Sequence, residues 1–132
     1  MNLKLWSWRG ENLEILHVCN DYYNTTIYRS FNNNLLLKKI NSVMLVPSNY
    51  KYVNRMDEEN VFQDRCFNSF DRLLFFKKQK RIINAIERQV EENKPDLLHA
   101  HFLFTNGYAC MRIGHKHKIP YIVAVRNTDL NV

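Results

Sequence analysis

Short apolar segments alternate with longer amphipathic ones along this chain, and that alternation restricts the folds open to it. The apolar, β-prone segments are residues 13–19, 43–46, 96–102 and 121–125. Residues 25–40, a stretch from 69 or 71 to 93, and residues 106–118 show helical periodicity. Strands separated by helices of this length predict βαβ crossovers and a mainly parallel sheet. The predicted fold class is therefore α/β, doubly wound, with helices on both faces.

The helical segments carry apolar residues at intervals of three to four. In the first, Ile27, Phe31 and Leu35 predict the buried face, and Asn24 or Thr25 is the candidate cap. In the second, the predicted buried side runs from Phe75 to Val90. Pro47 is predicted to end the strand at 43–46, residues 49–53 fit a strand or a loop, and residues 61–67 fit an edge strand.

Composition excludes several classes of protein. Hydrophobic residues make up 45% of the 132 residues and charged residues 24%, values typical of a globular chain rather than a disordered one. The three glycines do not offer the spacing of GxGxxG or of a P-loop. There is no apolar run of transmembrane length and no secretory signal pattern at the start. Three widely spaced cysteines fit reduced thiols, so we expect a cytoplasmic protein.

The chain carries a formal net charge of +6, which suits an anionic partner. The basic residues gather at 77–81 and at 115–118. We interpret both groups as solvated helix faces and the apolar stripe beside the first as packing on the sheet. An alternative is that Phe75 and Phe76, next to these bases, contact an anionic membrane surface on its inner face. Nucleic acid is not an expected partner, because no recognition motif accompanies the basic residues.

Polar residues follow three of the predicted strands, at positions 20–24, 101–106 and 126–129. In an open parallel sheet, ligands bind beyond the carboxyl ends of the strands, near the point where strand order reverses. Asp and Asn side chains can pair with hydroxyl groups, and Arg126 can make a bidentate contact with phosphate or carboxylate. These segments therefore predict a site for a hydroxylated or phosphorylated ligand.

Strand alternation places His99 and His101 on one face of the predicted strand at 96–102. A zinc site requires a third protein ligand, and the spacing of the other histidines and cysteines does not suggest one. We therefore expect no metal, with His99 as a hydrogen-bonded structural residue and His101 at the edge of the site. Cys19, at the end of a strand without an adjacent base, is interpreted as a buried structural thiol.

Two segments of the second half resemble a known family. Residues 94–101 read KPDLLHAH, Gly107 follows, and residues 119–129 read IPYIVAVRNTD. This order is similar to the N-terminal half of family 4 glycosyltransferases, which carry a KPDhhHxH strand, a helix, and an hPhhhThHGxD or hhRGxD segment (h, hydrophobic). The segments ILHV at 15–18 and VMLVP at 43–47 are similar to the family's first βαβ unit. The resemblance covers about residues 13–131 and is most specific over 94–129.

This resemblance implies the GT-B arrangement, in which two Rossmann-like domains face a cleft. The N-terminal domain receives the acceptor and the C-terminal domain holds the nucleotide-sugar. Such enzymes transfer the sugar with retention of configuration and without a bound metal or other cofactor. The expected acceptor is a glycan, a lipid or a precursor of a cell-surface polysaccharide. Arg126 and His101 are then the expected catalytic residues, with His101 at the cleft floor. The implied acceptor-binding residues are Asn20, Asp21, Tyr22, Asn24, Thr25, Asn106 and Asp129.

Two departures from the family pattern affect these expectations. The first loop has Tyr23-Asn24-Thr25 where many members have paired glycines near the donor phosphate. Arg126 stands where many members have a histidine, and a guanidinium stays protonated, so it cannot act as a neutral acceptor. We expect residues 1–132 to be one acceptor-side domain without the donor-binding domain, inactive alone. The competing hypothesis is a non-catalytic Rossmann-like module that binds a membrane or a protein partner through its basic helix.

Overall fold

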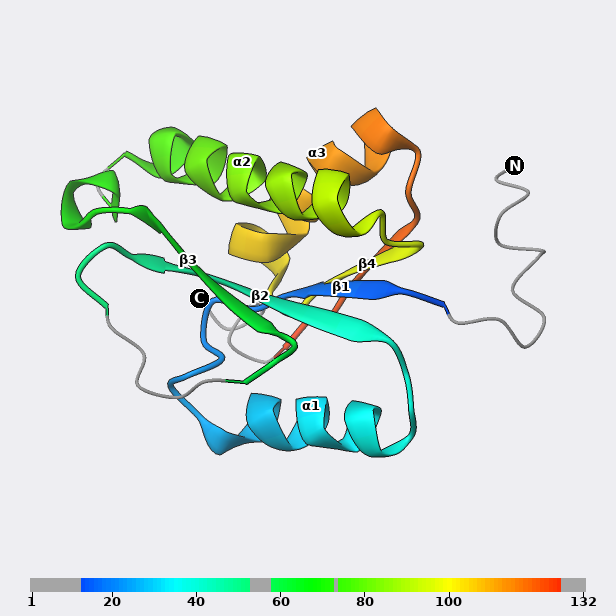
Figure 1. Ribbon diagram of the computed structural model, residues 1–132. Coiled ribbons are helices and arrows are strands. Elements are labelled where there is room, and N and C mark those ends of the chain that lie inside the picture. Colours follow the sequence, from blue (N-terminus) through cyan, green and yellow to red (C-terminus); the bar gives the residue numbers. More distant parts are fainter. Residues whose placement is uncertain (1–12, 53–57, 73, 127–132) are drawn as a thin grey trace.

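The computed structural model describes residues 13–52, 58–72 and 74–126, which form a five-stranded, all-parallel sheet (Figure 1). The strands are β1 (Ile15–Val18), β2 (Ser42–Asn49), β3 (Val61–Phe67), β4 (Leu97–Ala100) and β5 (Tyr121–Val123). Their order in the sheet is β3-β2-β1-β4-β5. Strand order therefore reverses between β1 and β4, as in a Rossmann-like, doubly wound fold. The prediction of an α/β, parallel, doubly wound domain is confirmed.

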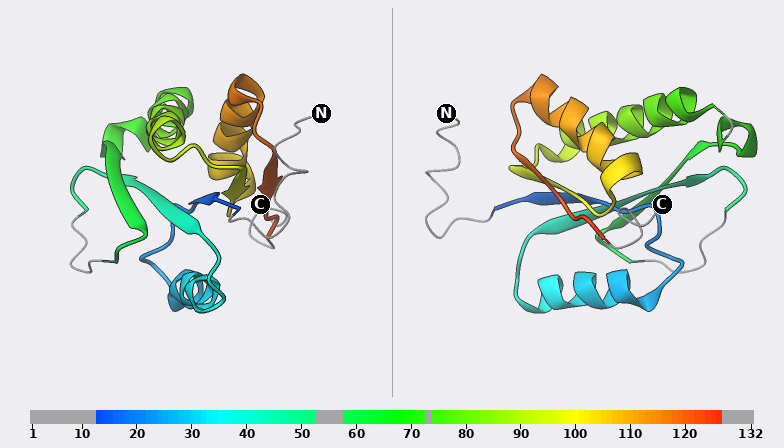
Figure 2. Two further views of the ribbon diagram at one scale, coloured as in Figure 1. Left: turned by 45° about the vertical axis from the view of Figure 1, so that its right-hand side comes forward. Right: turned by 180° about the vertical axis from the view of Figure 1, so that it is seen from behind.

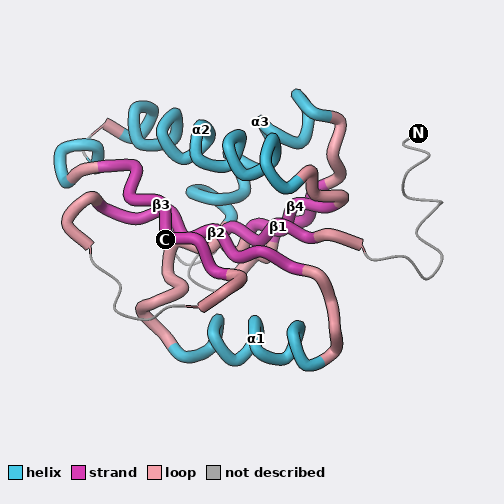
Figure 3. Tube along the Cα trace, viewed as in Figure 1, coloured by secondary structure: helices cyan, strands magenta, loops and turns pink. Residues whose placement is uncertain are grey.

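Helices cover both faces of the sheet, as expected (Figures 1 and 2). They are α1 (Thr26–Leu37), α2 (Phe75–Asn93) and α3 (Tyr108–His117). A short 3₁₀ helix (Ser69–Arg72) precedes α2, and a π-helical turn (Leu103–Gly107) precedes α3. Of the described helices, α1 lies on one face, and α2 and α3 lie side by side on the other. Figure 3 shows that the carboxyl ends of β2 and β3 and the loop after β1 lie at one edge of the molecule.

Each face of the sheet has its own hydrophobic core. Side chains of β1 and β4, such as Leu16 and Leu98, pack with Ile82 and Ile86 of α2 and with Ile113 of α3. On the opposite face, a smaller cluster joins residues of β2, of α1 and of the loop after β1. Its buried members are Cys19, Tyr22, Tyr28, Met44 and Val46. Burial on both faces explains the nearly continuous apolar character of the central strands.

The strand β2 continues through Pro47 to Asn49, so the prediction that Pro47 ends it is wrong. In a parallel sheet, successive residues of a strand direct their backbone groups toward alternate neighbours. The Met44 N–H donates to the Asn60 carbonyl on the β3 side, and the Leu45 carbonyl accepts from Cys19 on the β1 side. Pro47 therefore faces β1, which ends at Val18, and its missing N–H breaks no ladder hydrogen bond.

The buried face of α1 differs from the predicted stripe. Ile27 is 66% exposed, whereas Tyr28 and Asn32 are buried and Phe31 and Leu35 are partly buried. Asn32 is buried because its side-chain amide donates to the Tyr22 hydroxyl (3.3 Å) and exchanges hydrogen bonds with Asn60. A pattern of apolar residues alone misses a face that is anchored by polar contacts.

The long helix α2 packs on the sheet over only part of its length. From Gln79 onward one side is buried, but Phe75 and Phe76 are 47% and 81% exposed. The interpretation that the whole stripe packs on the sheet is therefore wrong for the first turn. The helix ends at Asn93, and Lys94 takes a left-handed conformation (φ 47°) before Pro95. Among the described residues, none of the helices is both long and apolar enough to cross a membrane.

Candidate functional site

A polar pocket of about 460 Å³ lies at the carboxyl ends of the strands, next to the point where strand order reverses. Three loops form most of it: the loop after β1, the end of β2 with its following turn, and the segment after β4. The lining residues are Asn20, Asp21, Tyr23, Asn24, Pro47, Ser48, Asn49, Tyr52, Phe67, Lys78, Phe102 and Thr105. The position agrees with the one that the fold class predicts for a ligand.

The loop after β1 is held in shape by its own polar groups. The Asn24 amide N–H donates to the Asp21 carbonyl, and its side-chain amide donates to the Asp21 carboxylate, both at 3.0 Å. Asn106 lies buried behind this loop and donates from its side-chain amide to the Asn20 side-chain oxygen (2.8 Å). Asn20, Asp21 and Asn24 therefore line the pocket, while Asn106 supports it. Thr25 is the exposed N-cap position of α1, and its side chain forms no capping hydrogen bond.

Tyr22 does not line the pocket, because its side chain is fully buried. Its hydroxyl donates to the Glu58 carboxylate (2.6 Å) and accepts from Asn32. Arg29 pairs with the same carboxylate at 3.2 Å. Burial and the hydrogen bond to Glu58 raise the pKa of Tyr22. The residue anchors α1 and the loop after β1 to the segment that precedes β3.

Several pocket residues were not among the sequence candidates. The rings of Tyr23 and Tyr52 stack in nearly parallel planes, with centroids 5.6 Å apart. Ser48, Asn49 and Lys78 also reach the pocket, Lys78 with its ammonium group 4.6 Å from the centre of the Phe67 ring. Ser48 and Asn49 were missed because the strand was expected to end at Pro47. No pattern in the sequence indicates that Tyr23 and Tyr52 meet.

The fold brings Arg126 and His101 together. The Arg126 side chain donates from Nε to the His101 carbonyl (3.2 Å), and its guanidinium lies over the Tyr28 ring at 5.2 Å. His101 is only 2% exposed, so its ring lies below the surface rather than at the edge of the site. Asp129, the remaining candidate, lies outside the described residues.

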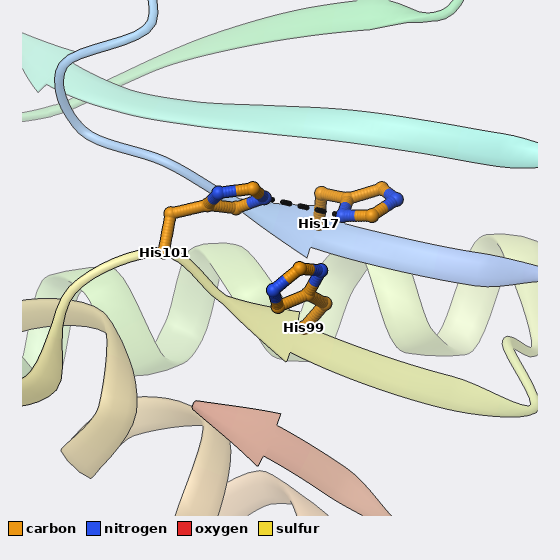
Figure 4. Close-up of side chains that lie close together, drawn as sticks. All are labelled: His17, His99 and His101. Atoms are coloured by element: carbon orange, nitrogen blue, oxygen red, sulfur yellow. Dashed lines mark hydrogen bonds between the residues drawn. The ribbon is translucent and has the colours of Figure 1, made fainter. Parts of the chain in front are cut away.

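Three histidines form one cluster, which the sequence reasoning did not anticipate (Figure 4). His17 of β1 is paired with His99 of β4 in the parallel register, and His101 follows two residues later. Nδ1 of His17 and Nε2 of His101 are hydrogen-bonded at 3.2 Å. The expectation that a third imidazole is lacking beside His99 and His101 is therefore wrong. It failed because strand pairing, not sequence spacing, places His17 there.

The cluster is electrically neutral near pH 7. Burial, and then the proximity of His99, lowers the pKa of His17 from 6.5 to about 3. Burial and the neighbouring His99, His17 and Arg126 lower the pKa of His101 to about 3 as well. The pKa of His99 is also lowered, by burial and by Arg126. Uncharged imidazoles can hydrogen-bond or ligate a metal, but they do not supply positive charge to a ligand.

All three cysteines are buried free thiols, which agrees with the interpretation of Cys19 as structural. Burial is the main cause that raises the pKa of Cys19 and of Cys110 to about 12 and that of Cys66 to about 11. Thiols of this kind remain protonated near neutral pH and are poor nucleophiles. Their burial and raised pKa values fit structural thiols rather than nucleophiles.

One sequence comparison relates part of this chain to a glycosyltransferase. No protein-family model matches the chain. A segment of 55 residues, 40% of the chain, is 33% identical to the "Putative teichuronic acid biosynthesis glycosyltransferase TuaC" of Bacillus subtilis (strain 168). The aligned segment spans only 14% of that protein's length. The match supports a relationship to glycosyltransferases.

Proposed function

We propose that this chain is the acceptor-side, Rossmann-like domain of a retaining glycosyltransferase of family 4 with the GT-B arrangement. The enzyme would move a sugar from a nucleotide-sugar to a hydroxyl group of a glycan, a lipid or a polysaccharide precursor. The observation that carries the proposal is the polar pocket at the carboxyl ends of the strands. The distant relationship to a glycosyltransferase supports it.

The chemistry of the pocket suits a sugar better than a flat apolar ligand. Amide, hydroxyl and carboxylate groups of Asn20, Asp21, Asn24 and Ser48 can donate to and accept from several hydroxyl groups at once. The stacked Tyr23 and Tyr52 add aromatic surface against which the apolar side of a sugar ring can pack. The ammonium group of Lys78 gives the same pocket a positive charge for a phosphate or carboxylate on the ligand.

In this proposal Arg126 supplies the positive charge for the transfer and His101 positions it. A guanidinium can stabilise the departing diphosphate or hold an anionic acceptor. The hydrogen bond from Arg126 to the His101 carbonyl fixes the direction of that side chain. Because His101 is buried and neutral, its expected contribution is to hold Arg126 and the cleft floor.

The donor half of the cleft would belong to a separate C-terminal domain, which binds most of the nucleotide-sugar. The transfer needs both walls, because the reacting groups must be held in alignment and away from water. The isolated domain should therefore bind an acceptor sugar weakly and show almost no transfer. No metal or other cofactor is part of this proposed step.

Acceptor binding can be tested on the isolated domain by following backbone amide NMR signals during titration with methyl glucoside, N-acetylglucosamine and glucuronic acid. At least one sugar should shift signals of residues 20–24, 48–52 and 102–105 without shifting those of 14–16 and 41–43 at the opposite edge. The change Asn24→Ala should weaken binding about threefold to tenfold, the worth of one hydrogen bond. The matched control is Asn33→Ala, on the exposed side of α1.

Transfer can be tested by joining the chain to the donor-binding half of TuaC and assaying with a panel of nucleotide-sugars. Arg126→Ala should lower the rate by about 100-fold, the usual effect of removing one group that stabilises developing charge. Arg112→Ala, on the exposed side of α3, is the matched control. If the fusion is active and Arg126→Ala has no larger effect than Arg112→Ala, Arg126 takes no part in the reaction. If no sugar binds at the pocket in the NMR titration, the domain does not bind the acceptor there.

Exposed aromatic residues favour a second candidate function, peripheral binding to an anionic membrane. Phe70 of the 3₁₀ helix, Leu74 at the N-cap of α2, and Phe75 and Phe76 in its first turn are all exposed, at the same edge of the sheet as the pocket. The basic side chains of residues 77–81 follow directly. Apolar side chains beside bases are the features that bind an anionic bilayer surface. Such contact on the inner face of the membrane would bring a lipid-linked acceptor to the pocket.

Flotation with vesicles of phosphatidylcholine and phosphatidylglycerol tests this candidate. The protein should float at low salt and lose binding in 0.5 M salt, because screening weakens attraction between surface charges. Replacing both Phe75 and Phe76 with Ser should abolish flotation, whereas replacing the exposed Leu37 of α1 with Ser should not. Equal flotation of the two variants would contradict a membrane contact through α2.

A further inference from the structure

The histidine cluster lies where the two central strands of the sheet meet. The parallel register pairs His17 of β1 with His99 of β4. Side chains two residues apart on a strand point to the same face, so His101 joins them from just beyond β4. Figure 4 shows the three rings gathered on one side of these strands. One imidazole thus comes from β1, one from β4 and one from the residue that follows β4.

The spacing of the ring nitrogens is close to that of a metal centre. One nitrogen from each ring can be chosen so that all three lie within 4.8 Å of one another. Two nitrogens bound to tetrahedral zinc at 2.0–2.1 Å are about 3.3 Å apart. Nδ1 of His17 and Nε2 of His101 already lie at 3.2 Å. The longest separation in this set, 4.8 Å, exceeds the spacing in a tetrahedral site by about 1.5 Å.

Two nitrogens of the cluster have unmet hydrogen-bonding capacity. Nε2 of His17 and Nδ1 of His101 are buried and have no partner among the described residues. The His99 ring forms no hydrogen bond within that same part of the chain and makes only ring contacts, stacking on His101 with centroids 4.3 Å apart. Neither Nε2 of His17 nor Nδ1 of His101 belongs to the pair of nitrogens that lies 3.2 Å apart, so an ion held between that pair does not supply their missing partners.

We propose that His17, His99 and His101 form a binding site for a divalent transition metal of the zinc class. Three imidazole nitrogens are a donor set that zinc accepts while keeping a fourth position open. The fourth coordination position of the metal would face the partly exposed side of the cluster, at His99. It would be filled by a water molecule or by an anion that binds through oxygen. Arg126 donates a hydrogen bond to the His101 carbonyl, so its positive charge lies near the cluster and repels a metal cation. An anionic fourth ligand on the metal would offset this repulsion.

The metal takes no part in the proposed sugar transfer, since the resemblance to family 4 enzymes implies none, although the two sites share His101. Its consequence is structural: the metal would tie β1 to β4 across the point where strand order reverses. Hydrophobic packing of three neutral rings against Phe31 and Tyr28 is the competing explanation of the cluster, and it requires no ion.

Cobalt(II) is the probe that distinguishes these explanations. The full chain, without a polyhistidine tag and stripped with chelator, is titrated with Co²⁺ while its visible spectrum is recorded. We expect one equivalent to produce the strong visible bands of tetrahedral cobalt, which Zn²⁺ then displaces, and a rise in melting temperature with Zn²⁺. His99→Ala should weaken binding at least tenfold, and it is the variant of choice because His99 is the most exposed of the three.

The control is His115→Gln, which removes an exposed histidine of α3 and should leave the cobalt spectrum and stoichiometry unchanged. Circular dichroism checks that both variants fold. Failure of the folded wild-type chain to bind Co²⁺ or Zn²⁺ at micromolar concentrations would overturn the proposal. So would binding that survives in His99→Ala and is lost in His115→Gln, because that result would place the metal on α3.

Discussion

Mild acid should destabilise the domain through its buried histidines. His17 and His101 are 1% and 2% exposed, and the pKa of each is lowered to about 3. In the unfolded chain both return to the ordinary value near 6.5. Between pH 6.5 and pH 3 the unfolded state therefore binds protons that the folded state does not. Stability is complete above pH 6.5 and falls as the pH is lowered through this window.

The size of the effect follows from the width of the window. At pH 5.0 each histidine is 1.5 pH units below its unfolded pKa, so each contributes about 2 kcal/mol of destabilisation at 1.36 kcal/mol per unit. The two together give about 4 kcal/mol, a large part of the 5–15 kcal/mol typical of a domain. Their mutual repulsion does not enter, because neither ring is protonated in the folded state at pH 5.0. His99 changes stability in the same direction.

Urea denaturation followed by circular dichroism, in chelator, between pH 7.5 and pH 5.0 measures this loss. Replacing His17 with Gln and His101 with Asn should each remove about half of the pH dependence, and the double variant most of it. His115→Gln, on the exposed side of α3, should retain the wild-type slope. A wild-type free energy of unfolding that changes by less than about 1 kcal/mol over this range would show that the imidazoles are solvated and would refute the burial argument.

Two further substitutions test the packing of the helices. Gly114→Ala should lower the free energy of unfolding by about 1–2 kcal/mol, because the added Cβ would lie 2.8 Å from the Ile119 carbonyl oxygen and 2.9 Å from the Tyr121 ring. Gly107→Ala, whose Cβ would first meet a movable Val123 methyl group at 3.0 Å, should cost less, and an equal loss in the two urea titrations would contradict this reasoning. Lys94→Gly should stabilise the domain by about 1 kcal/mol, because Lys94 is left-handed at the end of α2, whereas Lys80→Gly inside the same helix should destabilise it by about as much. Thermal melting of the two lysine variants checks the sign, and a shift in the same direction for both would contradict the capping argument.

The architecture could be predicted from the sequence because its determinants are local. Apolar segments such as 13–19 and 121–125 are separated by long helical stretches, and that alternation favours a parallel sheet wherever the strands are placed. The prediction failed where a neighbour decides the outcome. Pro47 stays inside β2 because β1 has ended beside it, and Asn32 is buried because Tyr22 and Asn60 provide hydrogen bonds.

The same distinction between local and non-local determinants applies to the residues of the candidate site. Asn20, Asp21 and Asn24 could be identified because loops after parallel strands are known to meet at one edge. His17 could not, because it lies 82 positions from His99 in the chain and becomes its neighbour only through the pairing of β1 with β4. An open α/β sheet places its first strand beside a later one at the point where strand order reverses. Polar residues inside the first strand should therefore be compared with those of every later strand before a ligand set is judged incomplete.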